Sequence, residues 1–503
     1  MTHRLKFLIV MLLAQALVLP PAQSASPRDE LPDIGSPSSA SLSRDHEEQI
    51  GREIMRLLRE SGQVLEDPEV TEYVQTIGDR LVGQARESHY EFTFFVVDDP
   101  HINAFALPGG FIGVNAGLVL ASQTESELAG VLAHEIAHVT QKHIARRVEA
   151  SSRAGLVSTA ALLAAILVGA AVGAGTDVMQ GAIAVTQGAA LQQQINFTRS
   201  NESEADRVGI GILAAAGFDP HGMPTFFETM SRRQGLSMSR IPEFILTHPA
   251  PPDRIAESRA RAKKYPDVEP ADSPEYELTR ARIRVLSAAS ATDALRNFRE
   301  LAKQDDPGWS KEAVRYGEAI ALMRAGRPAE AVPLLTELRN RNQDVIAYHG
   351  ALGQAQIQAG QAKEAMATFR HAIGLFPRNV PLTIRYSQAL MRFGEPRQAH
   401  ALLLDLLNNV SPTPDQARLI ALAASAAGDT ADAYYYMSEF HVLNGNLPLA
   451  ADQLRLALAV PDLGGVRRAR FQARLDEIQE YLPEKRRRRV FDSPESERID
   501  DAP

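Results

Sequence analysis

The 503-residue sequence contains no cysteine, so disulfide bonds, thiolate nucleophiles and cysteine-ligated zinc sites are excluded. An excess of basic residues is lacking as well. The 53 Lys and Arg residues stand against 62 Asp and Glu residues, a formal net charge of −9, which argues against a general nucleic-acid binder. The hydrophobic content of 45% and the charged content of 23% are typical of a globular protein, and the length allows two or three domains.

The first residues lack an apolar run long enough for a comfortable membrane span. A basic stretch with Arg4 and Lys6 precedes the apolar residues 7–19, and small residues follow at 22–25, an order typical of an export signal. A retained anchor is the alternative. We therefore expect residues 1–25 to be a cleaved signal peptide and the Pro- and Ser-rich residues 26–42 to be a flexible linker. Export and the absence of cysteine favour a bacterial periplasm.

A His-Glu-x-x-His motif at residues 134–138 indicates metal chemistry. On an α-helix His134 and His138 lie one turn apart on the same face, where two imidazoles can share one Zn²⁺. Glu135 can then act as a general base toward the attacking water. The alternative is an amphipathic helix that carries two histidines by chance.

The residues around the motif predict one helix with a defined start. Thr124 and Glu127 have the spacing of a capping box. An apolar stripe for burial is then supplied by Leu128, Val131, Leu132, Ile136 and Val139.

A zinc site of this kind needs a third protein ligand, and residues 201–206 contain candidates. Glu202 and Asp206 are four residues apart and share a helix face, so one can bind the metal while the other orients a ligand histidine. Glu204 is the competing ligand, although it points to the other side of the helix. It also stands three residues after Asn201, where a capping glutamate belongs. Glu202 is the preferred ligand.

Other elements precede the motif. Helical patterns run from 43 to 61 and from Pro68 to Leu81, and residues 90–97 alternate like a strand. Residues 103–120 predict a hairpin that turns at 108–110. A strand exposed beside the metal could pair with an extended substrate, whereas the alternative is an ordinary packed hairpin.

The His-Glu-x-x-His motif, the later Glu-x-x-x-Asp and the text Asn-Ala-Phe-Ala-Leu-Pro-Gly-Gly at 103–110 together resemble the zinc peptidases of family M48, over roughly residues 43–265. The resemblance implies one Zn²⁺ per chain. It also implies His134, His138 and Glu202 as ligands, Glu135 as the catalytic base and Asp206 as a supporting acid.

Residues 246–255 also resemble a stretch of that family, and they contain two residues of open function. His248 lies in a proline-stiffened loop, where it either pins the loop by hydrogen bonds or occupies the open zinc position and keeps the enzyme latent. Arg254 either stabilises a tetrahedral oxyanion or holds Asp253 and the loop.

Residues 154–191 are dominated by small and apolar residues, and 156–175 carry no charge. We expect a small-residue helical hairpin that packs on the peptidase or touches a membrane surface. A true membrane span is the alternative.

The C-terminal half contains a repeat of 34 residues, which predicts tetratricopeptide helix pairs that bind protein. The period is marked by Gly326, Gly360, Gly394 and Gly428. An alanine stands five residues after each and a small residue seven residues before each, and Gly445 continues this register at half a period. The corresponding residues are Ala331, Ala365, Ala399, Ala433 and Ala450, and Ala319, Gly353, Ser387, Ala421 and Ser438.

These patterns predict an α+β, mainly α, protein. A zincin-like metallopeptidase domain at 43–270 is followed by connecting helices at 271–310, an all-α tetratricopeptide superhelix at 311–482 and a charged tail at 483–503. This domain order resembles M48 peptidases of the Gram-negative periplasm. The resemblance implies quality control of outer-membrane β-barrel proteins, with stalled or unfolded barrels as substrates and the barrel assembly machinery bound by the repeats. The rivals are a repeat-based chaperone or scaffold with a latent or structural zinc site, and a membrane-embedded peptidase.

Overall fold

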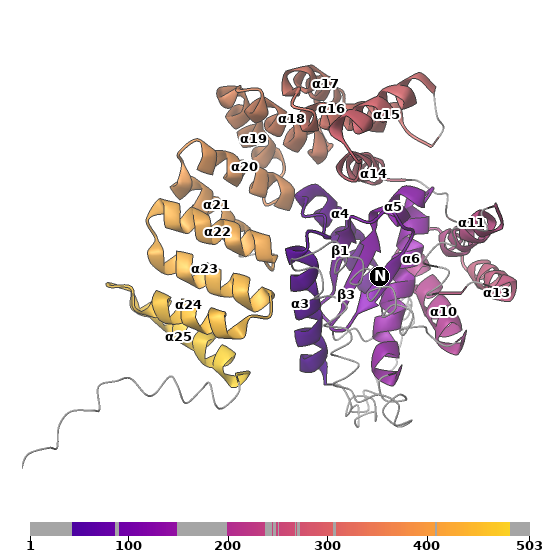
Figure 1. The fold of residues 1–503 in the computed structure, drawn as a ribbon, viewed down its shortest axis with the longest axis horizontal. Coiled ribbons are helices and arrows are strands. Elements are labelled where there is room, and N and C mark those ends of the chain that lie inside the picture. Colours follow the sequence, from indigo (N-terminus) through magenta and orange to yellow (C-terminus); the bar gives the residue numbers. More distant parts are fainter. Residues whose placement is uncertain are drawn as a thin grey trace, which may run out of the picture.

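The computed structural model describes residues 43–85, 90–147, 199–236, 244, 248–249, 251–266, 268, 272–304, 308–407 and 410–482. These residues form many helices and one small sheet, so the predicted mainly helical α+β class is confirmed. Figure 1 shows an N-terminal α/β unit in indigo to pink and a curved array of helices that arches over it and descends along one side.

Two helices open the described chain, and each begins after a capping side chain. Helix α3 (Arg44–Glu60) follows Ser43, and helix α4 (Pro68–Val82) follows Asp67. Each cap oxygen accepts a hydrogen bond from a backbone amide of the first turn, which has no partner within the helix. Both predicted helices are therefore confirmed.

The sheet has three strands, β1 (Thr93–Val97), β2 (Ala104–Leu107) and β3 (Phe111–Asn115), in the order β1-β3-β2. Strands β2 and β3 form the predicted antiparallel hairpin, while β1 runs parallel to β3. The turn needs glycine because Gly109 and Gly110 have φ values of 81° and 86°. This order leaves β2 at an edge of the sheet.

Helix α6 (Glu125–Thr140) carries the His-Glu-x-x-His motif through the centre of the unit. It packs against α4, β2, β3, α10 and α11, and every residue from Glu125 to Val139 is buried. The other helices of the unit are α5 (Ala116–Ala121), α10 (Arg199–Ala215), α11 (Gly222–Leu236) and α13 (Pro252–Ala262).

The apolar stripe predicted for α6 is buried, and so is the rest of the helix from Glu125 to Val139, because neighbouring elements cover it all round. Two local predictions need correction. The capping box is half formed: Thr124 accepts from the Glu127 amide, whereas the Glu127 carboxylate accepts from the Gln123 amide instead of the Thr124 amide. The strand predicted for 90–97 begins at Thr93.

Helix pairs form the C-terminal array. Its first pair, between the α/β unit and the predicted repeats, packs through α14 against α4 and α5. The pairs are α14 (Pro274–Leu286) with α15 (Ala291–Gln304), α16 (Lys311–Arg324) with α17 (Pro328–Arg341), α18 (Ile346–Gln358) with α19 (Ala362–Leu375), α20 (Val380–Arg392) with α21 (Pro396–Leu407), α22 (Pro414–Ala427) with α23 (Thr430–Leu443), and α24 (Leu447–Leu458) with α25 (Gly465–Glu480).

The periodic glycines lie between the helices, in the left-handed conformation that follows a helix end. Gly445 does the same after α23, so α23 follows one marked glycine, Gly428, and precedes another, Gly445, and packs against both α22 and α24. This position between two marked glycines explains the half period. Five of the marked glycines have positive φ, namely Gly326, Gly360, Gly394, Gly428 and Gly445, with values of 71°, 77°, 82°, 87° and 69°.

The small residues of the repeat lie where helices cross. Gly353 has no room for a methyl group, since a Cβ there would lie 2.5 Å from the Phe369 ring. The predicted small positions are buried at Ala319, Gly353, Ser387, Ala421, Ser438, Ala331, Ala365, Ala399 and Ala450, and only Ala433 is half-buried.

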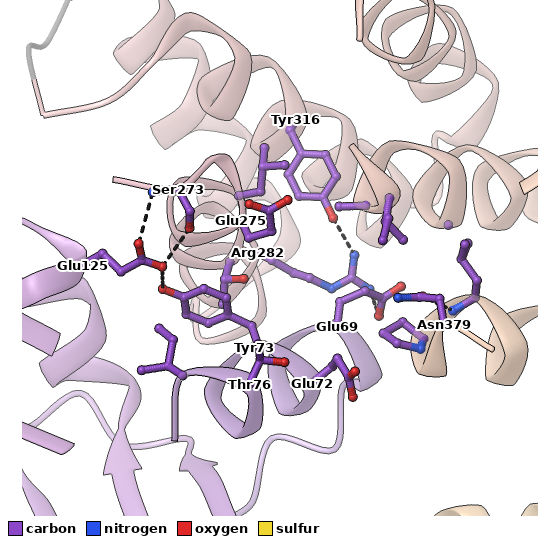
Figure 2. A pocket seen from close by; sticks show the side chains of 18 of the residues that line it. Glu69, Glu72, Tyr73, Thr76, Glu125, Ser273, Glu275, Arg282, Tyr316 and Asn379 are labelled. Atoms are coloured by element: carbon purple, nitrogen blue, oxygen red, sulfur yellow. Dashed lines mark hydrogen bonds and ion pairs between the residues drawn. The ribbon is translucent and has the colours of Figure 1, made fainter. Parts of the chain in front are cut away.

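A charge network that is largely buried joins α4 to the array. The Arg282 Nε lies 2.7 Å from an Asp67 carboxylate oxygen, and its Nη1 donates to the Tyr316 hydroxyl at 3.0 Å. Arg385 donates to both Asp67 and Glu69. We call these five residues, Asp67, Glu69, Arg282, Tyr316 and Arg385, the junction network. Figure 2 shows its Arg282–Tyr316 contact.

A second contact joins the metal-motif helix to the array. The Glu125 carboxylate, at the start of α6, accepts hydrogen bonds from the Tyr73 hydroxyl at 2.9 Å and the Ser273 hydroxyl at 2.7 Å (Figure 2). Both contacts line a cavity of about 380 Å³ between α4 and the inner helices of the array. The position of α6 is therefore tied directly to the first array helix.

Several predicted segments lie outside the described residues: the signal peptide at 1–25, the linker at 26–42, the small-residue hairpin at 154–191 and the charged tail at 483–503. Among the residues that are described, no helix has both the length and the apolar character needed to cross a membrane.

Candidate metal centre

Helix α6 brings the two histidines of the motif together. The Nε2 atoms of His134 and His138 are 3.0 Å apart, and both side chains are fully buried. One helical turn separates the residues, so the rings project from the same face as predicted. Their second ring nitrogens point away from each other toward different partners.

Helix α10 supplies two carboxylates from the same face. The Glu202 carboxylate lies 3.5 Å from His134 Nε2 and 3.5 Å from His138 Nε2. Asp206, one turn later, lies 3.0 Å from His134 Nδ1. Glu202 therefore faces the two Nε2 atoms, whereas Asp206 lies behind the His134 ring, the arrangement that orients a ligand histidine.

His248 completes the cluster. Its Nδ1 is 3.4 Å from His134 Nε2 and 3.1 Å from a Glu202 oxygen. Each of the four residues offers one donor atom, and these atoms all lie within 4.8 Å of one another. His248 thus lies within the cluster that could hold a metal ion, which is compatible with the second of the two roles left open by the sequence.

The four side chains fit a zinc ion. Ligand atoms at about 2.0–2.1 Å from a tetrahedral zinc stand about 3.3–3.4 Å apart, close to the separations seen here. In the neutral form that binds a metal, each imidazole carries only one hydrogen. Ring nitrogens and carboxylate oxygens that converge in this way therefore present more lone pairs than protons. A divalent cation satisfies such a group of acceptors.

Glu135 is the candidate base beside this cluster. Both carboxylate oxygens are buried without a hydrogen-bond partner among the described residues. The Nε2 atom of His248 lies 3.5 Å from one of these oxygens. Burial raises the pKa of Glu135, which moves a carboxylate toward the range needed to accept and return a proton.

Arg254 is tied to the carboxylates of α10. Its Nε and Nη2 donate to both oxygens of Asp206 at 2.6 and 2.8 Å, and its Nη1 lies 2.7 Å from Glu202. Nη1 also donates to the Pro249 carbonyl at 2.8 Å. The contacts with Asp206, Glu202 and the loop carbonyl of Pro249 favour a positioning role for Arg254, one of the two roles left open by the sequence.

The charges of the cluster determine which groups are ionised. Burial would raise the pKa of Asp206, but the hydrogen bonds and charge of Arg254 hold it below its usual range. Burial alone would lower the pKa of His134, yet hydrogen bonds to Asp206 and Glu202 raise it to about 9. The two carboxylates therefore create a field that attracts a cation at the His134 side of the cluster.

Two residues behind His138 were missed or misread in the sequence. His143 Nδ1 lies 2.8 Å from His138 Nδ1, and the Glu204 carboxylate contacts His143 Nε2 at 3.2 Å. Glu204 does not belong to the four-residue cluster. It is not a capping residue either, because Asn201 lies inside α10. The only available signal was a third histidine soon after the motif.

Comparison with known proteins supports these assignments at the level of family. The model of peptidase family M48 matches residues 68–262, and a tetratricopeptide repeat model matches 356–423. A Vibrio cholerae protein whose description reads beta-barrel assembly-enhancing protease is 36% identical over 458 residues, 91% of this chain and 94% of that protein. The beta-barrel assembly-enhancing protease of Escherichia coli is 33% identical over 463 residues, 91% of this chain and 92% of that protein.

A shorter match extends to mitochondria. The mitochondrial metalloendopeptidase OMA1 of Schizosaccharomyces pombe is 34% identical over 188 residues, which is 37% of this chain and 51% of that protein. The Vibrio cholerae and Escherichia coli proteins thus match nearly the whole chain, whereas the Schizosaccharomyces pombe protein matches little more than a third of it.

Proposed function

This chain belongs to peptidase family M48, together with the β-barrel assembly-enhancing proteases, and on that premise we propose that it is a periplasmic zinc endopeptidase for outer-membrane β-barrel proteins. The observation that carries the proposal is the convergence of His134, His138 and Glu202 beside a buried, unpaired Glu135. Stalled or unfolded barrels would be its substrates.

In the proposed reaction, Glu135 is the group that moves protons. A bound zinc would polarise the peptide carbonyl and activate water. The Glu135 carboxylate accepts the proton of the attacking water and returns it to the leaving nitrogen. Asp206 holds the His134 ring through Nδ1, and Arg254 holds Asp206 and Glu202 in place.

The edge strand β2 is the proposed binding site for the substrate backbone. It lies at an edge of the sheet and packs against α6, the helix that carries the metal motif. An extended chain that pairs with this edge would place a peptide bond near Glu135. The array of helix pairs would supply a second protein-binding surface, for the barrel assembly machinery or the substrate.

His248 supports a latent resting state. Its Nδ1 lies within the ligand cluster, and Phe244, whose carbonyl accepts from the His248 amide, is itself hydrogen-bonded to the Ile102 carbonyl beside β2. His248 thus lies at the candidate metal cluster, while Phe244 is hydrogen-bonded to the chain just before β2. In this closed state the protein could act only through its repeats, which is the specific argument for an additional chaperone role.

The test compares casein cleavage by purified mature wild type, Glu135→Gln and His248→Ala, with zinc measured in each. We expect weak cleavage by wild type and stronger cleavage by His248→Ala. Glu135→Gln should retain zinc and lose activity by about 10²–10⁴-fold. Zinc loss in Glu135→Gln would show that Glu135 is a ligand. Three inactive proteins with equal zinc would favour the chaperone or scaffold reading.

A further inference from the structure

Behind the ligand histidine His138 lies a chain of side chains that leads to the protein surface. The His143 ring is fully buried between His138 and Glu204. Glu204 is only partly buried and also accepts a hydrogen bond from Arg146 Nη1 at 3.0 Å. The contacts therefore run in one line from the metal centre to a surface ion pair.

This line depends on a break in the helix. Five residues along an uninterrupted α-helix correspond to a rotation of about 140° away from the starting side chain, so His143 would face a different direction from His138. Instead, α6 ends at Thr140 and Lys142 has a φ of 53°, in the left-handed region that non-glycine residues seldom adopt. The chain turns there and returns the His143 ring to His138.

The hydrogens along this line can be assigned in only one way if His138 binds a metal through Nε2. The His138 Nδ1 then carries a hydrogen and donates it to His143 Nδ1. His143 must therefore carry its own hydrogen on Nε2, from which it donates to the Glu204 carboxylate. Arg146 donates a hydrogen bond to that carboxylate and holds it in place.

We propose that His143 and Glu204 are positioning residues that set the orientation and tautomer of His138 for metal binding. This inference rests on the proposed metal centre. The two ligand histidines are then held by different means: Asp206 contacts His134 directly, whereas Glu204 reaches His138 through a second imidazole. Partners of this kind contribute about 10–100-fold to metal affinity.

The experiment measures zinc affinity of the full-length protein by competition with a chromophoric chelator. His143→Leu removes the acceptor at similar size, while His143→Asn keeps an oxygen near the position of Nδ1. Glu204→Gln weakens only the outer end of the line. The matched control is Glu228→Gln, which breaks the Arg259–Glu228 surface pair of the same unit.

We expect His143→Leu to bind zinc about 10–100-fold more weakly than wild type. The zinc affinity of His143→Asn should be higher than that of His143→Leu but lower than that of wild type. Glu204→Gln should have an affinity between those of wild type and His143→Leu, and the affinity of the control should equal that of wild type. Equal affinity in wild type and His143→Leu, or equal losses in His143→Asn and His143→Leu, would overturn the proposal. Absence of zinc binding by wild type would instead refute the metal centre itself. Because affinity is measured without substrate, failure of the proposed peptidase function leaves this readout intact.

Discussion

Among the described residues, the largely buried junction network and the fully buried candidate metal centre differ in how their atoms face each other. In the junction network, donors of Arg282 and Arg385 meet the acceptors of Asp67 and Glu69. In the metal centre, the ring nitrogens of His134, His138 and His248 converge with a Glu202 carboxylate on one point.

The comparison distinguishes charged groups that are buried to stabilise the fold from charged groups that are buried to perform a function. A cluster whose donors and acceptors are matched is complete by itself and stabilises one arrangement of two protein segments. A cluster in which acceptors converge, next to a carboxylate such as Glu135 that accepts no hydrogen bond from the described residues, is an arrangement that a cation would complete. Burying either cluster costs free energy, but only the second has acceptor atoms left with which to bind a cation.

The largest expected effect is at the junction network. Arg282→Met should lower the free energy of unfolding by about 3–5 kcal/mol, because Asp67 and Glu69 would remain buried with only Arg385 as a cation. Urea unfolding measures the change. The control Arg327→Met breaks only the exposed pair with Glu330 and should have no measurable effect. A similar stability for both variants would show that the junction network contributes little.

Arg254→Met is the matched change in the metal centre. Removing this cation leaves Glu202 and Asp206 less well held, so zinc affinity should fall by about 10–100-fold. Unlike the junction variant, this protein should regain thermal stability when zinc is added, since the metal supplies positive charge and binds only the folded state. If excess zinc leaves its melting temperature unchanged, the contrast between the clusters does not hold.

The junction network should also respond to acid. Burial would raise the pKa of Asp67, but Arg282 and Arg385 hold it below its ordinary value of 3.8. The stabilising contribution of this carboxylate is therefore complete above pH 3.8 and is lost as the pH falls through the lowered pKa. Unfolding measured from pH 5 down to pH 2 should show a steeper acid loss below pH 3.8 in wild type than in Asp67→Asn. Parallel curves would contradict this assignment.

The smallest expected effect lies in the array, far from both clusters. At Gly360 an added Cβ meets no atom within 4 Å, so Gly360→Ala tests the cost of the left-handed backbone alone, at a φ of 77°. We expect a loss of about 1–2 kcal/mol in the free energy of unfolding. Gly374→Ala, also with open space around a Cβ but without a positive φ, is the control and should not be destabilised.

Much of the local structure could be predicted because it depends on neighbours in sequence. The starts of α3 and α4 follow from Ser43 and Asp67, and the hairpin turn from Gly109 and Gly110. The repeat was readable because each glycine ends a helix in the same way, even at the half period before α24. The pairing of His134 with His138 follows from helix geometry alone.

What the sequence could not show depends on packing between distant segments. The stripe of α6 was predicted correctly, but it could not reveal that polar residues such as Glu125 are also buried, against Tyr73 on α4 and Ser273 at the start of α14. Glu204 was misread because its partner, His143, lies 61 residues earlier in the chain. A sequence pattern carries no direct record of such distant contacts.

The sequence by itself determined the family chemistry: a helical His-Glu-x-x-His motif, a later Glu-x-x-x-Asp and a 34-residue helical repeat. Only the tertiary structure decided the position of His248 among the ligands, the attachment of Arg254 to two carboxylates and the line from His138 through His143 to Glu204. The physical reason is that helical periodicity places residues three or four apart on one face, whereas contacts between distant segments depend on how the complete set of helices and strands packs.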